Sequence, residues 1–442
     1  MAYSSGLSTQ PTGSNPQQPY STSEKGAVAA GTFLGMAVGA LMQEGRGSVM
    51  GGALGYLVSN QAIGLYKAFT VKGSPLYLKK SWAEPVSAND PRESMTKLLD
   101  MPEQQGVELG QGNFSRVQKF TCREGEPFVI KWIKDAEPGQ SSDMLADREK
   151  WFGLEKGEIN GLQLNQHPNL VKTYALLVQD TGSGQYSLIN HPEQVSPESR
   201  SQYKVKAVIN ECIDGVELKV ASTGVPELGI EPVPDILFMP EMAIKLGLPV
   251  CEALEYLHAN GVVYRDLKPE NIMIRRGDRE VKLVDLGFSK QLQPGEKTFS
   301  FCGTPEFVAP EVIIGEHSHS FESDAWSLGI VLLEMATGKT PDQFSMETGD
   351  LVEQPGNNFE TYQRVLDFGG ASGEEKKRFI RKHFAQRFFE HDKLLDIIVG
   401  LTEFDPEKRM KISEACEQLK VLRQKLKTQE RVDWVFSKLR LI

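Results

Sequence analysis

The segment at residues 264–271 (YRDLKPEN) limits what this chain can fold into more than any other segment. An apolar-periodic run at residues 251–258 and a turn signal at Asn260-Gly261 precede it, and a short apolar stretch at residues 272–274 follows it. This pattern predicts a tight loop between a helix and a strand, with charged residues concentrated in the loop.

Three residues of this loop suit the transfer of a phosphoryl group. Asp266 can accept a proton from a hydroxyl, Lys268 can neutralise a phosphoryl oxygen, and Asn271 can offer its carbonyl oxygen to a hard cation. Phosphoryl transfer depends mostly on positioning and charge stabilisation, which these residue types provide. The same residues could also form solvated surface, so other parts of the chain have to decide.

The composition is that of a soluble globular protein with more than one domain. The chain has 442 residues, of which 40% are hydrophobic and 24% are charged, and its formal net charge is −10. This negative balance argues against nucleic-acid binding, which needs a basic surface. The cysteines are scattered without metal-ligand spacing, which predicts free thiols in a reducing compartment: Cys122, Cys212, Cys251, Cys302 and Cys416.

Residues 1–23 and 70–101 are predicted to lack regular structure. The first segment is rich in Ser, Thr, Gln, Pro and Gly and has no charged residue, which predicts a disordered tail and no cleaved secretory signal. The second segment contains several prolines and little periodicity, as expected of a linker.

Residues 24–69 have the pattern of a helical hairpin with glycine seams. Glycines recur every fourth residue in two runs, which are Gly31, Gly35 and Gly39, then Gly47, Gly51 and Gly55. Positions four apart share one helix face, so each run leaves a stripe where a second backbone can approach closely. The segment resembles the glycine-zipper hairpins of membrane-associated proteins. We expect membrane association, with a soluble hairpin or a self-association seam as alternatives.

Lysines just beyond this hairpin favour a cytoplasmic position for the rest of the chain: Lys67, Lys72, Lys79 and Lys80. The expected location is therefore a membrane with the remaining chain on its cytoplasmic face. A soluble cytoplasmic protein is the alternative.

A glycine-rich turn between two strands is expected at residues 107–121. Glycine has no side chain, so the backbone amides around Gly110 and Gly112 could approach phosphate oxygens. The apolar strand at residues 128–133 contains a single charge, Lys131, which needs a partner if it is buried.

The helix expected at residues 147–166 contains two candidate partners for that lysine. Glu158 precedes the turn that closes the helix and is preferred, whereas Glu149 is expected on the surface. A polar insert is expected at residues 181–204, before a strand at residues 205–209.

A further acidic residue, Asp285, ends the strand expected at residues 281–287. Its carboxylate could be a second oxygen ligand for a divalent ion, although an Asx turn would use the same residue type. The remaining expectations are an apolar helix at residues 324–337, a loop-bearing insertion at residues 349–373 and helices within residues 376–423.

Together these motifs resemble a eukaryotic-type protein kinase domain over residues 102–425, with a C-terminal tail at residues 426–442. The motifs occur in the family's order and include Ala309-Pro310-Glu311. The resemblance implies an α+β fold of two lobes, a small β-rich N-lobe and a larger helical C-lobe, here preceded by the helical hairpin. It also implies ATP and Mg²⁺ as cofactors and protein substrates.

The resemblance implies a role for each matching residue. Asp266 would be the catalytic base, and Lys268 would steady the γ-phosphate. Lys131, paired with Glu158, would hold the α- and β-phosphates. The positions that match the nucleotide site are Leu109, Gly110, Gln111, Gly112, Asn113, Phe114, Ser115, Val117, Lys131, Glu211 and Ile213.

Other matching residues would bind metal or support the fold. Asn271 and Asp285 would hold magnesium. Glu311 would pair with a buried arginine, Arg409, and Asp324 would brace the backbone of the catalytic loop.

Two residues match Ser/Thr kinases and differ from tyrosine kinases, namely Lys268 and Thr304. Tyr264 and its neighbouring motifs are most like the cyclic-nucleotide-dependent group, whereas Phe307-Val308 also matches calmodulin-regulated kinases, so the subgroup stays open. The chain departs from the usual pattern at Ser115, Val129, Asn210 and Leu286.

Arg265, Lys290 and Ser300 suggest a phosphorylation switch. A phosphate on Ser300 could bridge the two basic residues and order the loop between them, although Ser300 could also be an ordinary loop serine. Glu217 and Glu270 match family positions that favour a basic residue upstream of the phosphoacceptor.

The sequence therefore predicts a membrane-tethered, ATP-dependent Ser/Thr protein kinase, with Thr304, Glu217 and Glu270 at the substrate. A pseudokinase scaffold is one alternative, and the intact set of Lys131, Asp266, Asn271 and Asp285 argues against it. A small-molecule kinase of the aminoglycoside type is another, and the Ala-Pro-Glu segment argues against that.

Overall fold

The computed structural model describes residues 106–439, apart from residues 112–114, 122–124, 135–156, 165, 224–239, 277, 294, 299–301, 316–318, 354 and 385–390. The predicted tail, glycine hairpin and linker lie outside the described residues. So do Glu149 and four of the predicted site residues, namely Gly112, Asn113, Phe114 and Ser300.

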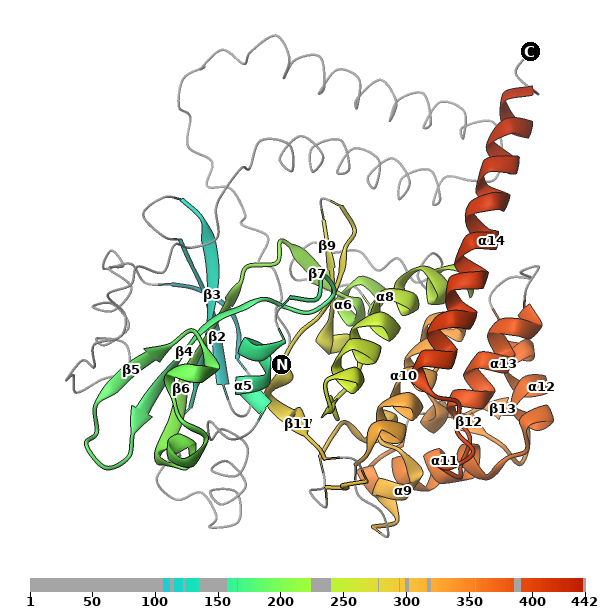
Figure 1. Cartoon of the computed structure of the whole chain (residues 1–442). Coiled ribbons are helices and arrows are strands. Elements are labelled where there is room, and N and C mark those ends of the chain that lie inside the picture. Colours follow the sequence, from blue (N-terminus) through green and yellow to red (C-terminus); the bar gives the residue numbers. More distant parts are fainter. Residues whose placement is uncertain are drawn as a thin grey trace.

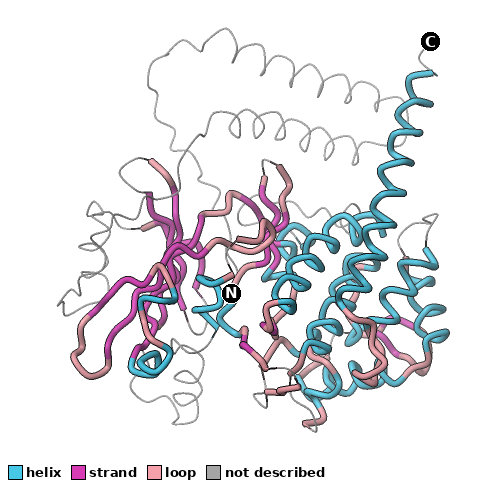
Figure 2. The backbone as a smooth tube through the Cα atoms, viewed as in Figure 1, coloured by secondary structure: helices cyan, strands magenta, loops and turns pink. Residues whose placement is uncertain are grey.

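The described chain forms two lobes, one built on a sheet and one mainly helical, and Figure 2 shows the strands and helices separated in this way. The predicted two-lobed α+β architecture is thereby confirmed. The sheet is antiparallel, in the order β1-β2-β3-β6-β4-β5. Its strands are β1 (Val107–Gln111), β2 (Ser115–Thr121), β3 (Pro127–Ile133), β4 (Thr173–Asp180), β5 (Tyr186–Ile189) and β6 (Tyr203–Glu211).

The alternation of side chains along β3 decides where its single charge points. Phe128, Ile130 and Trp132 pack into one apolar cluster on one face of the sheet. Successive residues of a strand point to opposite faces, so Val129 and Lys131 lie on the other face, and Val129 packs in the cluster that extends into the helical lobe. Lys131 therefore faces the space between the lobes.

The polar insert expected at residues 181–204 is wrong in part, because this segment contains the edge strand β5. Tyr186 and Leu188 pack into the cluster on one face of the sheet, and Ile189 packs on the other. The apolar residues of this strand span only four positions among polar neighbours, which is too short a pattern to predict a strand from the sequence. Two 3-10 turns follow, η2 (Pro192–Gln194) and η3 (Pro197–Gln202).

Figure 1 shows α10 among the other helices of the helical lobe. The side chains of α10 are almost all buried. α8, α12 and α13 pack against α10, and α14 packs against α8. The helices are α6 (Leu218–Thr223), α8 (Pro240–Ala259), α9 (Pro310–Ile313), α10 (Phe321–Thr337), α11 (Asn358–Gly370), α12 (Gly373–His383), α13 (His391–Leu401) and α14 (Ile412–Leu439).

Short strand pairs and 3-10 turns complete this lobe. The strands are β7 (Gly215–Glu217), β8 (Val262–Val263), β9 (Ile272–Arg275), β10 (Val281–Leu283), β11 (Lys290–Gln291), β12 (Phe344–Ser345) and β13 (Asp350–Leu351). The turns are η5 (Pro269–Asn271), η6 (Leu286–Phe288), η7 (Pro305–Phe307) and η8 (Pro341–Gln343). Residues 264–271 lie between α8 and β9, as the sequence predicted.

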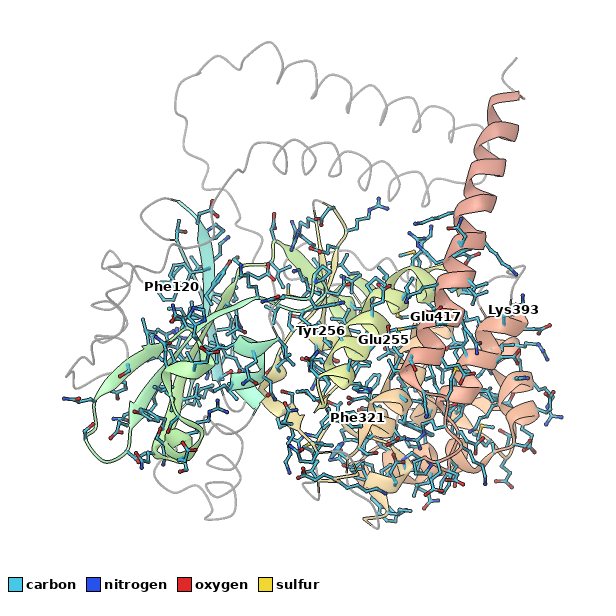
Figure 3. The ribbon with its side chains drawn as sticks, in the orientation of Figure 1. Phe120, Glu255, Tyr256, Phe321, Lys393 and Glu417 are labelled. Atoms are coloured by element: carbon cyan, nitrogen blue, oxygen red, sulfur yellow. The ribbon has the colours of Figure 1, made fainter. Side chains whose placement is uncertain are left out.

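The loop that precedes β4 joins the two lobes. The ring of His167 stacks on Tyr256 of α8 at 5.0 Å between centroids. Asn169 binds the first and last residues of β10. Its Nδ2 donates to Val281 O at 2.8 Å, and its O accepts from Leu283 N at 2.8 Å. Figure 3 shows Tyr256 in the helical lobe and Phe120 in the sheet lobe.

The loop-bearing insertion expected at residues 349–373 is wrong in part, because residues 358–370 form helix α11. Asn357 caps the helix by accepting a hydrogen bond from Glu360 N at 3.0 Å. Thr361, Val365 and Phe368 are buried at positions four and three apart, so a helical face exists that the polar neighbours concealed.

Helix α14 continues beyond the expected helical region into the segment from residue 426 onward, which the sequence predicted as a tail. Within the described residues, none of the helices combines the length and the apolar character that crossing a bilayer requires.

Candidate active site

Lys131 is buried between two carboxylates that come from distant parts of the chain. Its Nζ lies 2.6 Å from Asp285 Oδ1 and 3.3 Å from Glu158 Oε1, and only 4% of its surface is exposed. A buried ammonium needs such partners, because its transfer out of water costs several kcal/mol. β3, α5 (Gly157–Gln163) and the turn that follows β10 thus meet at one cation.

The ionisation of this trio is uneven. Burial by itself would raise the pKa of Asp285, but the Lys131 ammonium lowers it to about 2. Burial raises the pKa of Glu158, and the attraction of Lys131 only partly opposes this. Asp285 is the closer partner and therefore carries the negative charge that compensates Lys131.

The backbone at Asp285 turns sharply to present its carboxylate. Its φ of 60° is left-handed, and its Oδ1 accepts a hydrogen bond from Gly287 N at 3.2 Å. Gly287 leaves room for the trio, because a Cβ there would lie 3.0 Å from both Asp285 Oδ1 and Glu158 Oε1. Any larger residue at position 287 would press on both carboxylates.

Helix α5 is held against this turn by close packing and side-chain hydrogen bonds. A Cβ on Gly157 would lie only 2.2 Å from Leu286 O, so only glycine allows this approach. Asn160 Nδ2 donates to Ser289 Oγ at 3.0 Å, and Ser289 Oγ donates to Gly157 O at 3.3 Å. These contacts fix the position of Glu158.

The loop before β9 brings Asp266, Lys268 and Thr304 together. Lys268 Nζ lies 3.0 Å from Asp266 Oδ2 and donates to Thr304 Oγ1 at 2.8 Å. Thr304 Oγ1 also donates to Asp266 Oδ1, at 3.3 Å. Burial raises the pKa of Asp266, while Lys268 lowers it, so the carboxylate remains a usable proton acceptor.

Asp324 braces the backbone of this loop, as predicted. Its carboxylate accepts hydrogen bonds from Tyr264 N at 2.7 Å and from Arg265 N at 2.8 Å. Oδ2 of the same residue lies 2.8 Å from His258 Nε2. Arg265 has a φ of 73°, which is strained for a side-chain-bearing residue, and these hydrogen bonds hold it there.

Asn271 has the orientation that a cation ligand would need. Its Nδ2 donates to Asp266 O at 2.8 Å and to Asp266 Oδ2 at 3.0 Å. Its Oδ1 is buried, and within the described residues it accepts no hydrogen bond. Asn271 O accepts from Val284 N at 2.9 Å, which places the residue beside Asp285. An orphaned amide oxygen and a charged carboxylate fit a hard divalent cation such as Mg²⁺.

The remaining predicted nucleotide-site residues line the same side of the sheet. Val117, Ile213 and Leu109 belong to one apolar cluster with residues of the helical lobe, which suits a flat aromatic ring. The side chain of Glu211 turns away, because its Oε1 lies 3.1 Å from Lys282 Nζ and accepts from Lys172 N at 2.8 Å. Glu211 would therefore contribute its backbone only. Gly110, Gln111 and Ser115 are at the ends of β1 and β2, beside the undescribed turn.

An acidic group lies beside the catalytic loop and is larger than the sequence suggested. The charge of Glu270 raises the pKa values of Glu217, Glu306 and Glu334, after burial as the main cause, so these carboxylates share one region. The pKa values of Glu217 and Glu334 are both raised to about 7. The sequence pointed to Glu217 and Glu270 but missed Glu334, because that residue appeared to be part of the apolar helix α10.

The two basic residues of the expected switch have other partners in this structure. Arg265 Nε donates to Phe288 O at 2.5 Å, and Lys290 Nζ lies 3.9 Å from Glu296 Oε1. Ser300 lies outside the described residues.

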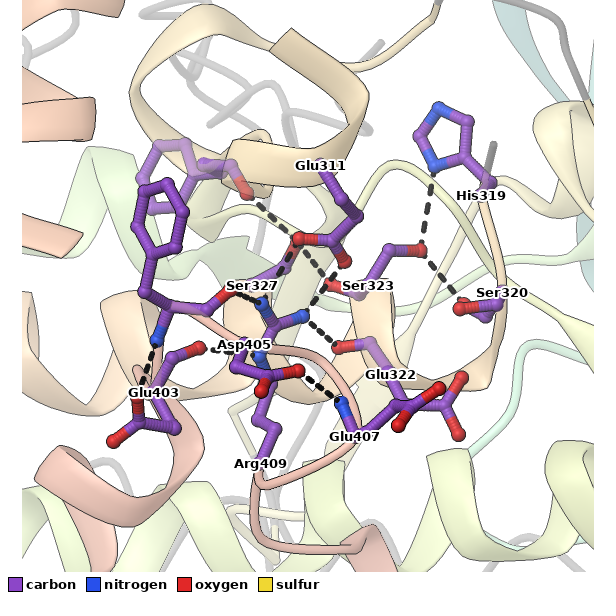
Figure 4. A network of polar contacts seen from close by, with 12 residues as sticks. Glu311, His319, Ser320, Glu322, Ser323, Ser327, Glu403, Asp405, Glu407 and Arg409 are labelled. Carbon is purple, nitrogen blue, oxygen red and sulfur yellow. Dashed lines mark hydrogen bonds and ion pairs between the residues drawn. The ribbon is translucent and has the colours of Figure 1, made fainter. Parts of the chain in front are cut away.

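Glu311 and Arg409 form the buried pair that the sequence predicted. Arg409 donates to both carboxylate oxygens of Glu311, at 2.7 and 2.9 Å (Figure 4). Its other donors reach the backbone oxygens of Glu322, Glu403 and Phe404. The Arg409 side chain is fully buried and the Glu311 side chain is 3% exposed, so the pair anchors the Ala-Pro-Glu segment to the end of the helical lobe.

A comparison with known families agrees with this geometry. The model of the protein kinase domain matches residues 104–419. The chain belongs to the protein kinase domain family. The matched residues include the described sheet lobe, the catalytic loop and the helical lobe as far as residue 419, in the first part of α14.

Several cGMP-dependent protein kinases share a shorter segment with this kinase domain. cGMP-dependent protein kinase, isozyme 2 forms cD5/T2, of Drosophila melanogaster is 55% identical over 93 residues, which are 21% of this chain and 10% of that protein. cGMP-dependent protein kinase 2 of Mus musculus is 54% identical over 92 residues, which are 21% of this chain and 12% of that protein. cGMP-dependent protein kinase egl-4 of Caenorhabditis elegans is 49% identical over 105 residues, which are 23% of this chain and 13% of that protein. The matches span 10 to 13% of these relatives.

Proposed function

We propose that the protein is a serine/threonine protein kinase that transfers the γ-phosphoryl group of ATP to a hydroxyl of a protein substrate. The observation that carries this proposal is the close association of Asp266, Lys268 and Thr304 beside the buried Lys131–Asp285 pair. The charge of Asp285 acts on Asp266, so both carboxylates face one region. Similarity to cGMP-dependent protein kinases supports the same reaction.

The residues divide the work between charge stabilisation and proton transfer. ATP with Mg²⁺, when bound, supplies the phosphoryl group and the cation that neutralises it. Lys131 is held by Asp285 and Glu158 and would hold phosphate oxygens, while Asn271 and Asp285 offer oxygen ligands to the metal. Asp266 orients the substrate hydroxyl and accepts its proton.

Lys268 and Thr304 would adapt this site to a Ser or Thr hydroxyl. Lys268 Nζ contacts both Asp266 and Thr304, so its ammonium lies next to the proton acceptor and can also neutralise the transferred group. Thr304 precedes η7, part of the segment on which a peptide would dock.

Asp266→Asn tests the proposal directly. The amide cannot accept the proton, so phosphorylation of protein substrates should fall about 10²- to 10⁴-fold, while ATP binding is retained. The control is Asp278→Asn, a half-exposed residue of the β9–β10 turn, which should keep full activity. Equal activity of the Asp266 variant and the wild type would instead support a pseudokinase scaffold with contaminating activity. Turnover of aminoglycosides but of no protein would support a small-molecule kinase.

The acidic group around Glu270 supports a preference for substrates with basic residues upstream of the phosphoacceptor. Oxygens of Glu217, Glu270 and Glu334 are buried and have no hydrogen-bond partner among the described residues. Buried carboxylate oxygens without partners are costly, and a cationic side chain would compensate them. A peptide array should show enrichment of Arg or Lys upstream, and an array without that enrichment would contradict the preference.

We also propose that a phosphate on Ser300 bridges Arg265 and Lys290 and raises activity by ordering the loop after η6. The support is the sequence spacing and the two basic side chains. When Ser300 is phosphorylated in the wild type, Ser300→Ala should lower the rate at which the protein phosphorylates its substrate. An unchanged rate would contradict the switch.

Membrane tethering through residues 24–69, with the kinase domain on the cytoplasmic face, remains a proposal supported by the glycine spacing. Self-association through the same seams is a second reading of that spacing. Fractionation of the full chain against a version lacking residues 1–70 tests the first. Sedimentation of both versions in detergent tests the second.

A further inference from the structure

The acidic group beside the catalytic loop already contains one cation, Lys219. Lys219 Nζ lies 3.4 Å from Glu334 Oε1, so an ion pair links α6 to the buried helix α10. Burial by itself would lower the pKa of Lys219, but the carboxylates of Glu334, Glu270 and Glu306 together outweigh burial and raise it. The lysine therefore sits within the field of the whole acidic group.

One ammonium does not compensate this group. Among the described residues, buried carboxylate oxygens without a hydrogen-bond partner remain on Glu217, Glu270, Glu306, Glu334 and Asp342. Glu217 is only 4% exposed, so it obtains little compensation from water. A buried carboxylate oxygen without a partner would be stabilised by a further cation.

Lys219 and its partner differ in their access to solvent. The Lys219 side chain is 39% exposed, whereas that of Glu334 is 9% exposed. The Lys219 ammonium is therefore within reach of water, while the Glu334 carboxylate stays buried. An incoming cationic side chain can replace Lys219 at Glu334, but it has to compete with the lysine.

We propose that Lys219 is a specificity-determining residue, an internal cation that occupies the Glu334 side of the acidic group. The Glu217 and Glu270 side remains available for one basic residue of the substrate. A first basic residue upstream of the phosphoacceptor then strengthens peptide binding greatly, and a second strengthens it little. This inference rests on the proposed binding of basic substrates at the same group.

Peptide binding tests the inference without requiring catalysis. Labelled peptides carry alanine at the phosphoacceptor position and no, one or two arginines upstream, and fluorescence anisotropy gives Kd for the full chain at pH 8. In the wild type, the first arginine should lower Kd about tenfold and the second by less than about threefold. In Lys219→Ala, the second arginine should lower Kd about tenfold as well.

Two further variants separate competition from a general change of charge. Lys219→Arg keeps the internal cation and should restore the weak effect of the second arginine. Lys420→Ala removes a lysine of similar exposure, 41%, whose partner Glu417 lies on α14 (Figure 3), and should behave as the wild type.

The outcomes distinguish the two proposals. If the first arginine strengthens binding but the second adds the same factor in the wild type and in Lys219→Ala, Lys219 does not compete and the inference is overturned, while basic-substrate binding stands. If neither arginine strengthens binding to any variant, both are overturned. If the second arginine lowers Kd about tenfold in Lys219→Ala but not in the wild type or the two control variants, the inference is established.

Discussion

Lys131 Nζ lies 2.6 Å from Asp285 Oδ1, although 154 positions separate the two residues along the chain. The sheet lobe provides the lysine, and the segment after β10 in the helical lobe provides the carboxylate. Glu158 completes the trio from α5. The ion pair therefore reports whether the two lobes are closed upon each other, and it is the contact on which nucleotide binding would depend.

Lys131→Met should abolish phosphotransfer and lower the free energy of unfolding. The substitution leaves the carboxylates of Glu158 and Asp285 buried side by side, at a cost of about 3–5 kcal/mol. Adding Glu158→Gln removes one of these charges and should restore part of the stability but none of the activity. Urea unfolding and a phosphotransfer assay measure the two effects. Full stability in the single variant would show that the trio is not buried in solution.

Glu311→Gln should destabilise the helical lobe by about 3–5 kcal/mol, because Arg409 would keep its charge in a fully buried position. Urea unfolding followed by circular dichroism checks this. The matched control is Asp392→Asn, which breaks the exposed pair with Arg381 and should cost less than about 1 kcal/mol. Similar losses in the two variants would contradict the burial of the Glu311–Arg409 pair.

Gly157→Ala should lower both activity and stability. The added Cβ would meet Leu286 O at 2.2 Å, so α5 has to move away from η6 and take Glu158 with it. Overpacking of this kind costs about 1–3 kcal/mol. Gly370→Ala, at the end of α11, is the control, since nothing lies within 4 Å of its added Cβ. The idea fails if Gly157→Ala binds ATP and turns over like the wild type.

Glu217→Gln should stabilise the protein at pH 8 and change little at pH 5. The folded pKa of Glu217 is raised to about 7 from an ordinary 4.5, by burial and by the charge of Glu270. Between these values the folded protein keeps a proton that the unfolded chain has released, so the contribution of Glu217 to stability falls as pH rises through this window. Above pH 7 the wild type carries a costly buried charge that the variant lacks.

Thermal or urea unfolding at the two pH values measures this difference. We expect the variant to gain about 1–3 kcal/mol at pH 8. Glu374→Gln removes an exposed carboxylate, 84% accessible, and should shift stability by less than about 0.5 kcal/mol at either pH. A gain for Glu217→Gln that is equal at pH 5 and pH 8 would rule out the proposed protonation.

Local patterns predicted the elements that stand in long, regular runs. The apolar runs around residues 128–133 and 324–337 are strand β3 and helix α10, because their side-chain periods match those of a strand and a buried helix. Polar segments misled the same reasoning. β5 and α11 each bury a narrow face among polar residues, and that face becomes visible only when the neighbouring sheet or helix covers it.

The sequence by itself determined the fold family and the chemical types in the site, because Asp266, Lys268 and Asn271 lie within six residues of one another in a loop bounded by clear elements. Only the tertiary structure decided which distant charges meet. Glu334 lay within an expected apolar helix, and its ion pair with Lys219 of α6 exists only in the folded chain. Electrostatic attraction depends on distance in space and on burial, and neither quantity is written in the order of the residues.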